Sequence, residues 1–287
     1  MATQQQQIDE EAVKEEKLRN KQRFNDSIKK YRADIDEVQK HIKGLEKDIK
    51  TKNDTHNGYR QVIIAMNNLK LVAYYCNMNK ESMAIMNIKN ENYLNDARKV
   101  LYQVLINIES VVTNYVDIPP SEIEEKVTAI ARLNPERKLN LLNNIGFHIQ
   151  MVVDSFGDNS KWKWSFVEVE GRYAVIAKNL IDYRQAIGNN DPRKPYYVEN
   201  INLMRLTKEL LERASKRYRD KYEQVTKEVE DIKKSIAFLS ALRRIAVLTG
   251  ESEEAAKLKR MIDITTKMME SGLKKKEGEK KESARKK

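Results

Sequence analysis

The segment FNDSIKKYRADIDEVQKHIKGLEKDI, at residues 24–49, determines the fold class of this 287-residue chain. Its apolar residues follow one another in alternating steps of four and three positions; they are Phe24, Ile28, Tyr31, Ile35, Val38, Ile42, Leu45 and Ile49. This is the heptad spacing of a coiled-coil seam, and charged residues fill most positions between its members. The pattern predicts a long helix with one buried seam, which we place at residues 8–53.

A second stripe with the same spacing lies towards the other end of the chain. Its members are Tyr218, Tyr222, Val225, Val229, Ile232, Ile236 and Leu239. Further leucines precede it, so the pattern predicts one helix over residues 198–249, about 75 Å long at about 1.5 Å per residue. A helix of that length needs a partner along its seam. We expect it to return antiparallel along the helix at residues 8–53, with pairing between two chains as the alternative.

Shorter amphipathic helices are expected between and after the two stripes. Residues 59–187 read as a helical bundle, and residues 252–270 as a final amphipathic helix. Residues 271–287 contain eight Lys or Arg against three Glu, which predicts a disordered basic tail. No β alternation of useful length occurs. The expected fold is therefore all-α: an elongated helical bundle with a long antiparallel coiled-coil arm.

The residues that catalysis or metal binding would need do not come together in this sequence. His41, His56 and His148 are far apart, and Cys76 is the only cysteine. We find no phosphate-binding loop, nucleophile elbow or dinucleotide fingerprint. We therefore expect no catalytic residues, no cofactor and no metal site. No apolar run reaches the roughly 18 residues needed to cross a bilayer, so no transmembrane segment is expected.

Two aromatic clusters are candidates for a protein interface. Trp162 and Trp164 alternate with lysines in an irregular segment, and Arg193, Tyr196 and Tyr197 surround a proline. Tyr, Trp and Arg are enriched where proteins bind one another, because they combine large contact area with a polar end. The alternatives for the tryptophans are that both rings pack beneath the turn and close the bundle, or that they stack on nucleic-acid bases.

The net charge of +11 allows a second hypothesis, in which the chain binds nucleic acid or another anionic surface. The basic tail supplies five of these excess charges. A further basic cluster consists of Arg213, Lys216, Arg217, Arg219 and Lys221. The other charges are dispersed over exposed helix faces, so we favour protein partners, either copies of the chain itself or a larger assembly.

The first residues, MATQQQQIDEE, lack the positive region and the apolar stretch of a secretion signal. The sequence as written therefore indicates the cytoplasm. A Gln-rich opening also suits a product whose leader has been removed, and the periplasm would then be the compartment.

Three segments resemble the layout of the spirochaetal flagellar coiling proteins. They are the heptad helix at residues 24–49, SKWKWSF at residues 160–166 and RRIAVLTG at residues 243–250. Proteins of that family are secreted, bent and helical, and they coat the periplasmic flagellar filament. The resemblance implies a structural scaffold of the bacterial flagellum, a filament sheath component with a role in motility. It identifies no individual binding residues.

Overall fold

The computed structural model describes residues 2–52, 54–118, 120–157 and 160–285, with side chains described over 11–52, 54–118, 122–157 and 160–274. These residues form α-helices, one π-helical turn and no strand, which confirms the all-α class. The elements are α1 (Ala2–Thr51), α2 (Asn57–Met86), α3 (Glu91–Val112), α4 (Pro120–Thr128), α5 (Pro135–Phe156), α6 (Phe166–Asn179), α7 (Tyr183–Gly188), α8 (Tyr197–Lys221), η1 (Tyr222–Thr226), α9 (Val229–Leu248) and α10 (Ser252–Arg285).

The helices belong to two compact units. Unit 1 comprises Met1–Asn107 with Asn144–Ser160, and unit 2 comprises Ile108–Asn143 with Lys161–Lys287. Helices α3 and α5 contribute residues to both units. The expectation of a single bundle over residues 59–187 is therefore wrong, because the compact units divide that range between them.

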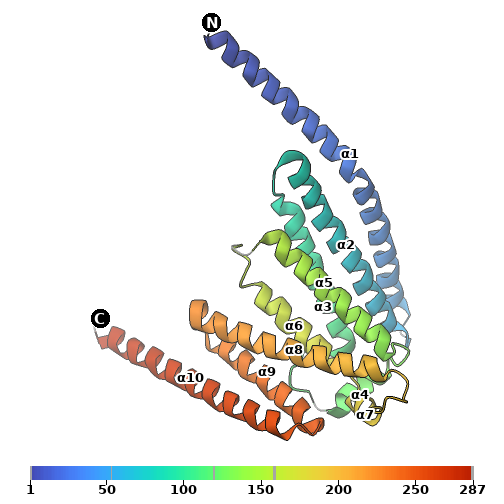
Figure 1. The fold of residues 1–287 in the computed structure, drawn as a ribbon, viewed down its shortest axis with the longest axis vertical. Coiled ribbons are helices and arrows are strands. Elements are labelled where there is room, and N and C mark those ends of the chain that lie inside the picture. Colours follow the sequence, from blue (N-terminus) through green and yellow to red (C-terminus); the bar gives the residue numbers. More distant parts are fainter. Residues whose placement is uncertain (1, 53, 119, 158–159, 286–287) are drawn as a thin grey trace. The chain divides into compact units, whose positions relative to one another are not determined.

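In unit 1, the heptad seam of α1 packs along α2 (Figure 1). All eight seam residues belong to this core or pack against it, and Ile28 is fully buried. The ring of Tyr31 lies 6.0 Å from that of Tyr74, measured between centroids. A later residue of α1, His41, lies 3.5 Å from an earlier residue of α2, Asn67. The two helices therefore run antiparallel.

The prediction that this seam pairs with a helix at residues 198–249 is wrong. The seam packs on α2, whereas residues 198–249 belong to unit 2. The physical reason lies in α2 itself, where Ile64, Leu71 and Met78 recur every seven residues and match the seam. A partner reached through a short turn also costs less loop-closure entropy than one that follows about 150 residues later.

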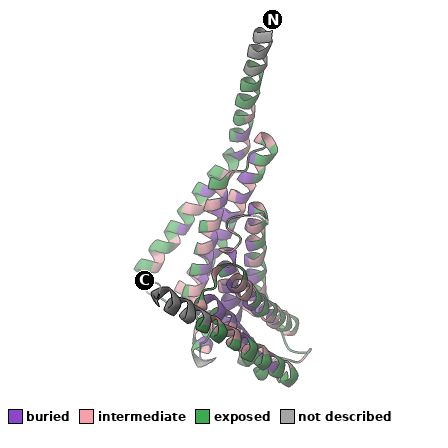
Figure 2. Ribbon diagram, turned by 90° about the vertical axis from the view of Figure 1, so that its left-hand side faces the viewer, coloured by how far each residue is buried: buried purple, intermediate pink, exposed green. Residues whose placement is uncertain are grey.

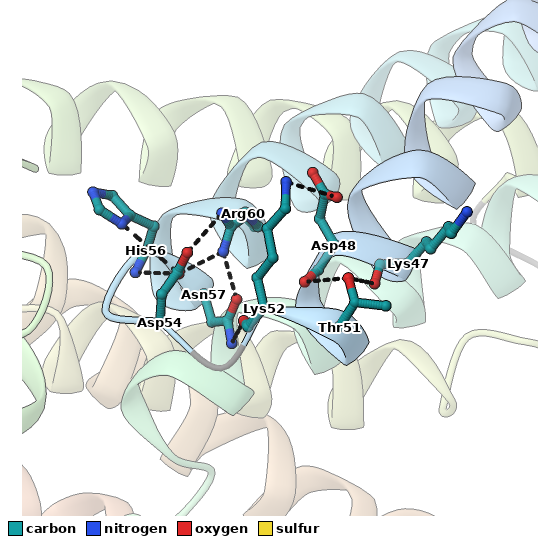
Figure 3. A network of polar contacts seen from close by, with 8 residues as sticks. All are labelled: Lys47, Asp48, Thr51, Lys52, Asp54, His56, Asn57 and Arg60. Atoms are coloured by element: carbon teal, nitrogen blue, oxygen red, sulfur yellow. Dashed lines mark hydrogen bonds and ion pairs between the residues drawn. The ribbon is translucent and has the colours of Figure 1, made fainter.

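A polar network holds the turn between α1 and α2 (Figure 3). The guanidinium of Arg60 donates to both carboxylate oxygens of Asp54, at 2.6 and 3.0 Å, and to Asn57 at 2.7 Å. The Asn57 amide donates to the Lys52 carbonyl at 3.1 Å, which links the end of α1 to the start of α2. These bonds fix the reversal and so the register of the helix pair.

In unit 2, α8 and α9 form an antiparallel hairpin, so the single helix predicted over residues 198–249 is wrong. Ser215 Oγ lies 3.0 Å from Ser235 Oγ, whereas Lys221, later in α8, pairs at 2.9 Å with Asp231, earlier in α9. The rings of Tyr218 and Phe238 stack between the two helices with centroids 5.7 Å apart. Of the second stripe, Tyr218, Tyr222, Ile232 and Leu239 are buried, Val229 and Ile236 are half-buried, and Val225 is exposed.

The chain reverses over η1 and the two residues after it. Lys227 adopts a left-handed conformation with φ 51°, and Glu228 is extended. Thr226 Oγ1 donates to Asp231 Oδ2 at 2.6 Å, and Lys221 Nζ donates to Asp231 Oδ1 at 2.9 Å. The buried Asp231 carboxylate therefore ties the end of α8 to the start of α9.

Helix α10 packs against α9 and continues to Arg285. The predicted final helix is present, but the expectation that it ends near Glu270 and that a disordered tail begins at residue 271 is wrong. The side chains of the Lys-rich part from residue 275 onward lie outside the described residues.

Candidate functional site

The two predicted tryptophans lie in the turn that precedes α6. Both side chains are half-buried, so neither ring is fully packed beneath the turn and neither is fully exposed to a partner. A lysine ammonium lies over each indole ring, 5.7 Å from the centroid of Trp162 and 5.6 Å from that of Trp164. Ser165 Oγ donates to the Trp162 carbonyl at 2.8 Å and does not cap α6. The turn is thus held from within, and the interface role of the rings stays a prediction.

The second predicted cluster lies at the start of α8. Tyr196 precedes the helix in a left-handed conformation with φ 61°, and its hydroxyl accepts a hydrogen bond of 3.1 Å from the Asn134 amide. The exposed Arg193 is bound by Asp191 through bonds of 3.1 and 3.0 Å. This pairing raises the pKa of Arg193 and lowers the pKa of Asp191.

The structure does not bring these two clusters together. Helices α6 and α8 are antiparallel, because Arg217, late in α8, pairs at 2.9 Å with Glu170, early in α6. The tryptophans therefore lie towards the C-terminal end of α8, and Tyr196 adjoins its N-terminal end. The clusters are separated by about 30 Å of helix at about 1.5 Å per residue.

The basic cluster on α8 is largely committed to carboxylates of its own unit. Arg217 pairs with Glu170, Arg219 with Glu223 and Lys221 with Asp231, each at 2.9 Å. Arg213 and Lys216 are exposed. Phosphate contacts by the three paired residues would have to displace these carboxylates, which disfavours the nucleic-acid hypothesis for this cluster.

A groove of about 510 Å³ opens beside the second cluster, and we call it the α8 groove. It runs along α8 from Tyr197 to Glu212, with α7 and the α9–α10 connection as its other walls. Its apolar wall consists of Ile187, Ile201, Met204 and Leu242. Ile187 and Ile201 are 40% and 42% exposed, and both line the groove, so a molecule bound there would cover two apolar side chains from different helices.

Carboxylates predominate among the charged residues of the α8 groove. Its charged residues are Arg205, Lys208, Glu209, Glu212, Glu251 and Glu254, so acidic residues exceed basic ones by two. Lys208 forms an ion pair with Glu251, and Thr249 Oγ1 donates to the same carboxylate at 2.9 Å. The hydrogen bond from Lys208 is the main cause that lowers the pKa of Glu251. The groove is thus locally acidic, although the chain carries a net charge of +11.

Asn200 is the most unusual residue of the α8 groove. Its side chain lines the groove and is only 9% exposed. Within the described part of the chain, its amide nitrogen has no hydrogen-bond acceptor. A buried donor without an acceptor costs about 1–3 kcal/mol, so this amide would gain from a bound molecule that supplies an acceptor.

Sequence reasoning identified only one residue of this groove, Tyr197. The groove depends on the reversal at η1, which brings α9 and the start of α10 beside α8, and that reversal was not predicted. In the sequence, Asn200 and Thr207 share a heptad spacing with Leu203 and Leu210, and only their burial in the structure sets them apart from other polar residues of α8.

A second, more open pocket of about 680 Å³ occurs in unit 1, between α2 and α5. It is lined by Met83, Met151 and Phe147, and Phe147 is 61% exposed. Across the described side chains, no group of three or more His, Cys, Asp or Glu residues is arranged to hold a metal ion. None of the described helices combines the length and the apolar character needed to span a bilayer.

Comparison with known proteins identifies the family of this chain. No curated protein matches the chain. A solved structure of a designed, self-assembling cyclic homooligomer aligns with 88% of this chain and 98% of its own, at 13% identity and a TM-score of 0.28. The model of the TP0443 family, a Treponema protein family, matches residues 20–273. The chain therefore belongs to the TP0443 family.

Proposed function

We propose that this protein is a non-enzymatic assembly protein that binds another protein chain in the α8 groove. One observation carries the proposal, namely the buried amide of Asn200, which has no acceptor within the described residues. A carbonyl oxygen of a bound chain would accept from this amide and remove the cost of leaving it unpaired.

The surroundings of Asn200 support a protein as the bound molecule. Exposed apolar side chains on two different helices, Ile187 and Ile201, flank the groove and would be covered on binding. The groove extends over about 22 Å of α8 at about 1.5 Å per residue, which suits a helical or extended segment. Apolar anchors around a buried polar group are typical of the energetic centre of protein interfaces.

The more specific form of the proposal is a sheath component of the flagellar filament. It is motivated by the resemblance to flagellar coiling proteins, and membership of a Treponema family agrees with a spirochaetal origin. The partner would then be the filament itself, and the compartment the periplasm.

The experiment is co-sedimentation of the purified chain with purified Treponema flagellar filaments. We expect the double variant Asn200→Ala with Ile201→Ser to bind about tenfold more weakly than the wild type, because it loses both the donor and an apolar anchor. Val198→Ser is the matched control, since Val198 lies on the same helix, is 60% exposed and does not line the groove.

Circular dichroism establishes that each variant is folded. No binding by the wild type would overturn the assignment to the filament. Equal binding by the double variant and the wild type would overturn the assignment to the groove.

A further inference from the structure

The part of α1 that precedes its seam has almost no buried side chain. From residue 11 to residue 23, every side chain is exposed except that of Asn20, which is half-buried. In Figure 2, the part of α1 next to the grey N-terminal residues is mostly in the colour of exposed residues. Val13 and Leu18 are 49% and 67% exposed, although both are large and apolar. This stretch is a helical surface that the rest of unit 1 leaves uncovered.

The exposed stretch has two chemically different faces. At about 100° per residue, Val13, Lys14, Lys17, Leu18 and Lys21 fall within an arc of about 140°, and we call this arc the lysine face. The opposite side carries Glu15 and Arg19, whose side chains pair with each other at 3.1 Å. The face that stays available for a partner is therefore basic and partly apolar.

The lysine face points in the same direction as the seam of α1. Measured from Val13 around the helix axis, Phe24 and Ile28 lie at about 20° and 60°, within the same arc. Phe24 and Ile28 are buried in the core that α1 forms with α2. The uncovered stretch thus presents the side on which α1 already binds a helix, but with lysines in place of most seam residues.

The α8 groove has the complementary chemistry. It offers an excess of two carboxylates and an apolar wall that includes Ile201 and Met204, whereas the lysine face offers three ammonium groups, Val13 and Leu18. The face is about 12 Å long from Val13 to Lys21, which fits within the groove's length of about 22 Å. The excess of carboxylates in this groove favours contact with a basic segment.

We infer that the lysine face of one copy of this chain binds the α8 groove of a second copy. The contact joins two different surfaces, so in a pair one copy keeps a free α8 groove and the other keeps a free lysine face. Such head-to-tail contacts give rings where the rotation closes and open filaments where it does not. The inference rests on the proposed function in one respect only, which is that the α8 groove binds a protein chain.

The test is a reciprocal charge exchange followed by sedimentation velocity. The first variant carries Lys14→Glu, Lys17→Glu and Lys21→Glu, and the second carries Glu209→Lys and Glu212→Lys. We expect the wild type to associate in a concentration-dependent way at low ionic strength and less at high salt. Each variant alone should associate at least about tenfold more weakly, because like charges then face each other.

An equimolar mixture of the two variants should restore association, because each altered surface then meets its complement. Misfolding would not be repaired by mixing, so this result separates a docking role from a structural one. The matched control exchanges the pair on the opposite face, Glu15→Arg with Arg19→Glu, and should associate like the wild type.

A monomeric wild type at all concentrations, or a mixture that fails to associate, would overturn the inference. So would loss of association on deletion of residues 271–287 with no loss in the lysine-face variant, since the Lys-rich end would then be the occupant. Failure here is distinguishable from failure of the proposed function. If the wild type is monomeric but its binding to filaments still depends on Asn200, only the inference of self-association is contradicted.

Discussion

A Cβ atom on Gly171 would lie 2.7 Å from Cε2 of Tyr218 and 3.1 Å from its hydroxyl oxygen. Helix α6 thus approaches α8 at a point where no side chain fits. Tyr218 has little room to move, because it is 3% exposed and stacks on Phe238. Packing between α6, α8 and α9 therefore depends on the glycine.

Gly171→Ala should lower the free energy of unfolding of unit 2 by about 1–3 kcal/mol, the usual cost of overpacking. Helix propensity alone predicts the opposite, a gain of about 1 kcal/mol. Urea denaturation followed by tryptophan fluorescence measures unit 2, because both tryptophans of the chain lie in it.

Gly44→Ala is the matched control, since Gly44 lies inside α1 and is exposed, and a Cβ atom added to it would meet no neighbouring atom within 4 Å. This substitution should stabilise unit 1 by about 0.5–1 kcal/mol, measured by circular dichroism. A destabilised Gly44→Ala, or a Gly171→Ala as stable as the wild type, would contradict the argument from close approach.

The seam of α1 was predictable because its spacing is uninterrupted over eight residues and every member is at least partly buried. Its partner was not, because α2 is apolar around much of its surface, and its seven-residue repeat at Ile64, Leu71 and Met78 is hidden among other apolar residues. A heptad pattern specifies that a helix pairs, and the choice between several apolar partners depends on their relative free energies.

The α8 groove could not be predicted from the sequence for a related reason. The reversal that creates it contains no Gly and no Pro, and it is held instead by the side chains of Thr226, Lys221 and Asp231. Local propensity therefore favours a continuous helix, and tertiary contacts override it. Tyr197 was recognised from its residue type alone, whereas Asn200 acquires its meaning only from burial.

The carboxyl group of Asp54 should titrate well below its usual range. The hydrogen bond from Arg60 is the main cause that lowers its pKa from 3.8 to about 2. Because the folded pKa is depressed, the stabilisation from this pair is present above pH 3.8 and is lost as the pH falls towards 2. NMR titration of the Asp54 carboxyl carbon should give a midpoint near 2 in the wild type.

In Arg60→Gln, this midpoint should rise towards 3.8, because the charged donor is gone. Arg19→Gln provides the control, since Arg19 pairs with Glu15 elsewhere on α1. A midpoint that does not respond to Arg60→Gln would show that the network drawn in Figure 3 does not form in solution.

Lys138 should make unit 2 more stable as the pH rises above 8. Its side chain is 5% exposed, and burial lowers its pKa from 10.5 to about 8. The folded state therefore binds fewer protons than the unfolded state between these values, so the free energy of unfolding increases with pH in that window. Lys178 has the same shift and contributes in the same direction.

Lys138→Met should raise stability at neutral pH by up to about 3 kcal/mol and reduce the rise between pH 8 and 10. Measurements stop at pH 10, because the pKa of Tyr173 is raised to about 12 and ionisation of tyrosine in the unfolded state then acts in the opposite direction. Lys216→Met, at an exposed position of α8, should leave the slope unchanged. A Lys138→Met slope equal to that of the wild type would refute the assignment.

Arg172 and Glu109 form a two-pronged ion pair between α6 and the end of α3, with bonds of 2.8 and 2.5 Å. Their side chains are only 23% and 9% exposed, so solvent screens the pair weakly. Arg172→Met would leave the Glu109 carboxylate buried without its cation, and should lower the free energy of unfolding by about 3 kcal/mol. Tryptophan fluorescence during urea denaturation again reports on unit 2.

The double variant Arg172→Met with Glu109→Leu should recover most of that loss, because two apolar side chains of similar volume replace both charges. The coupling free energy from the four-member cycle is then the informative quantity. The exposed pair between Arg184 and Glu124, where Arg184 is 83% exposed, should give a coupling below about 1 kcal/mol. Strictly additive losses at Arg172 and Glu109 would mean that each side chain acts through other neighbours and that the pair does not join α6 to α3.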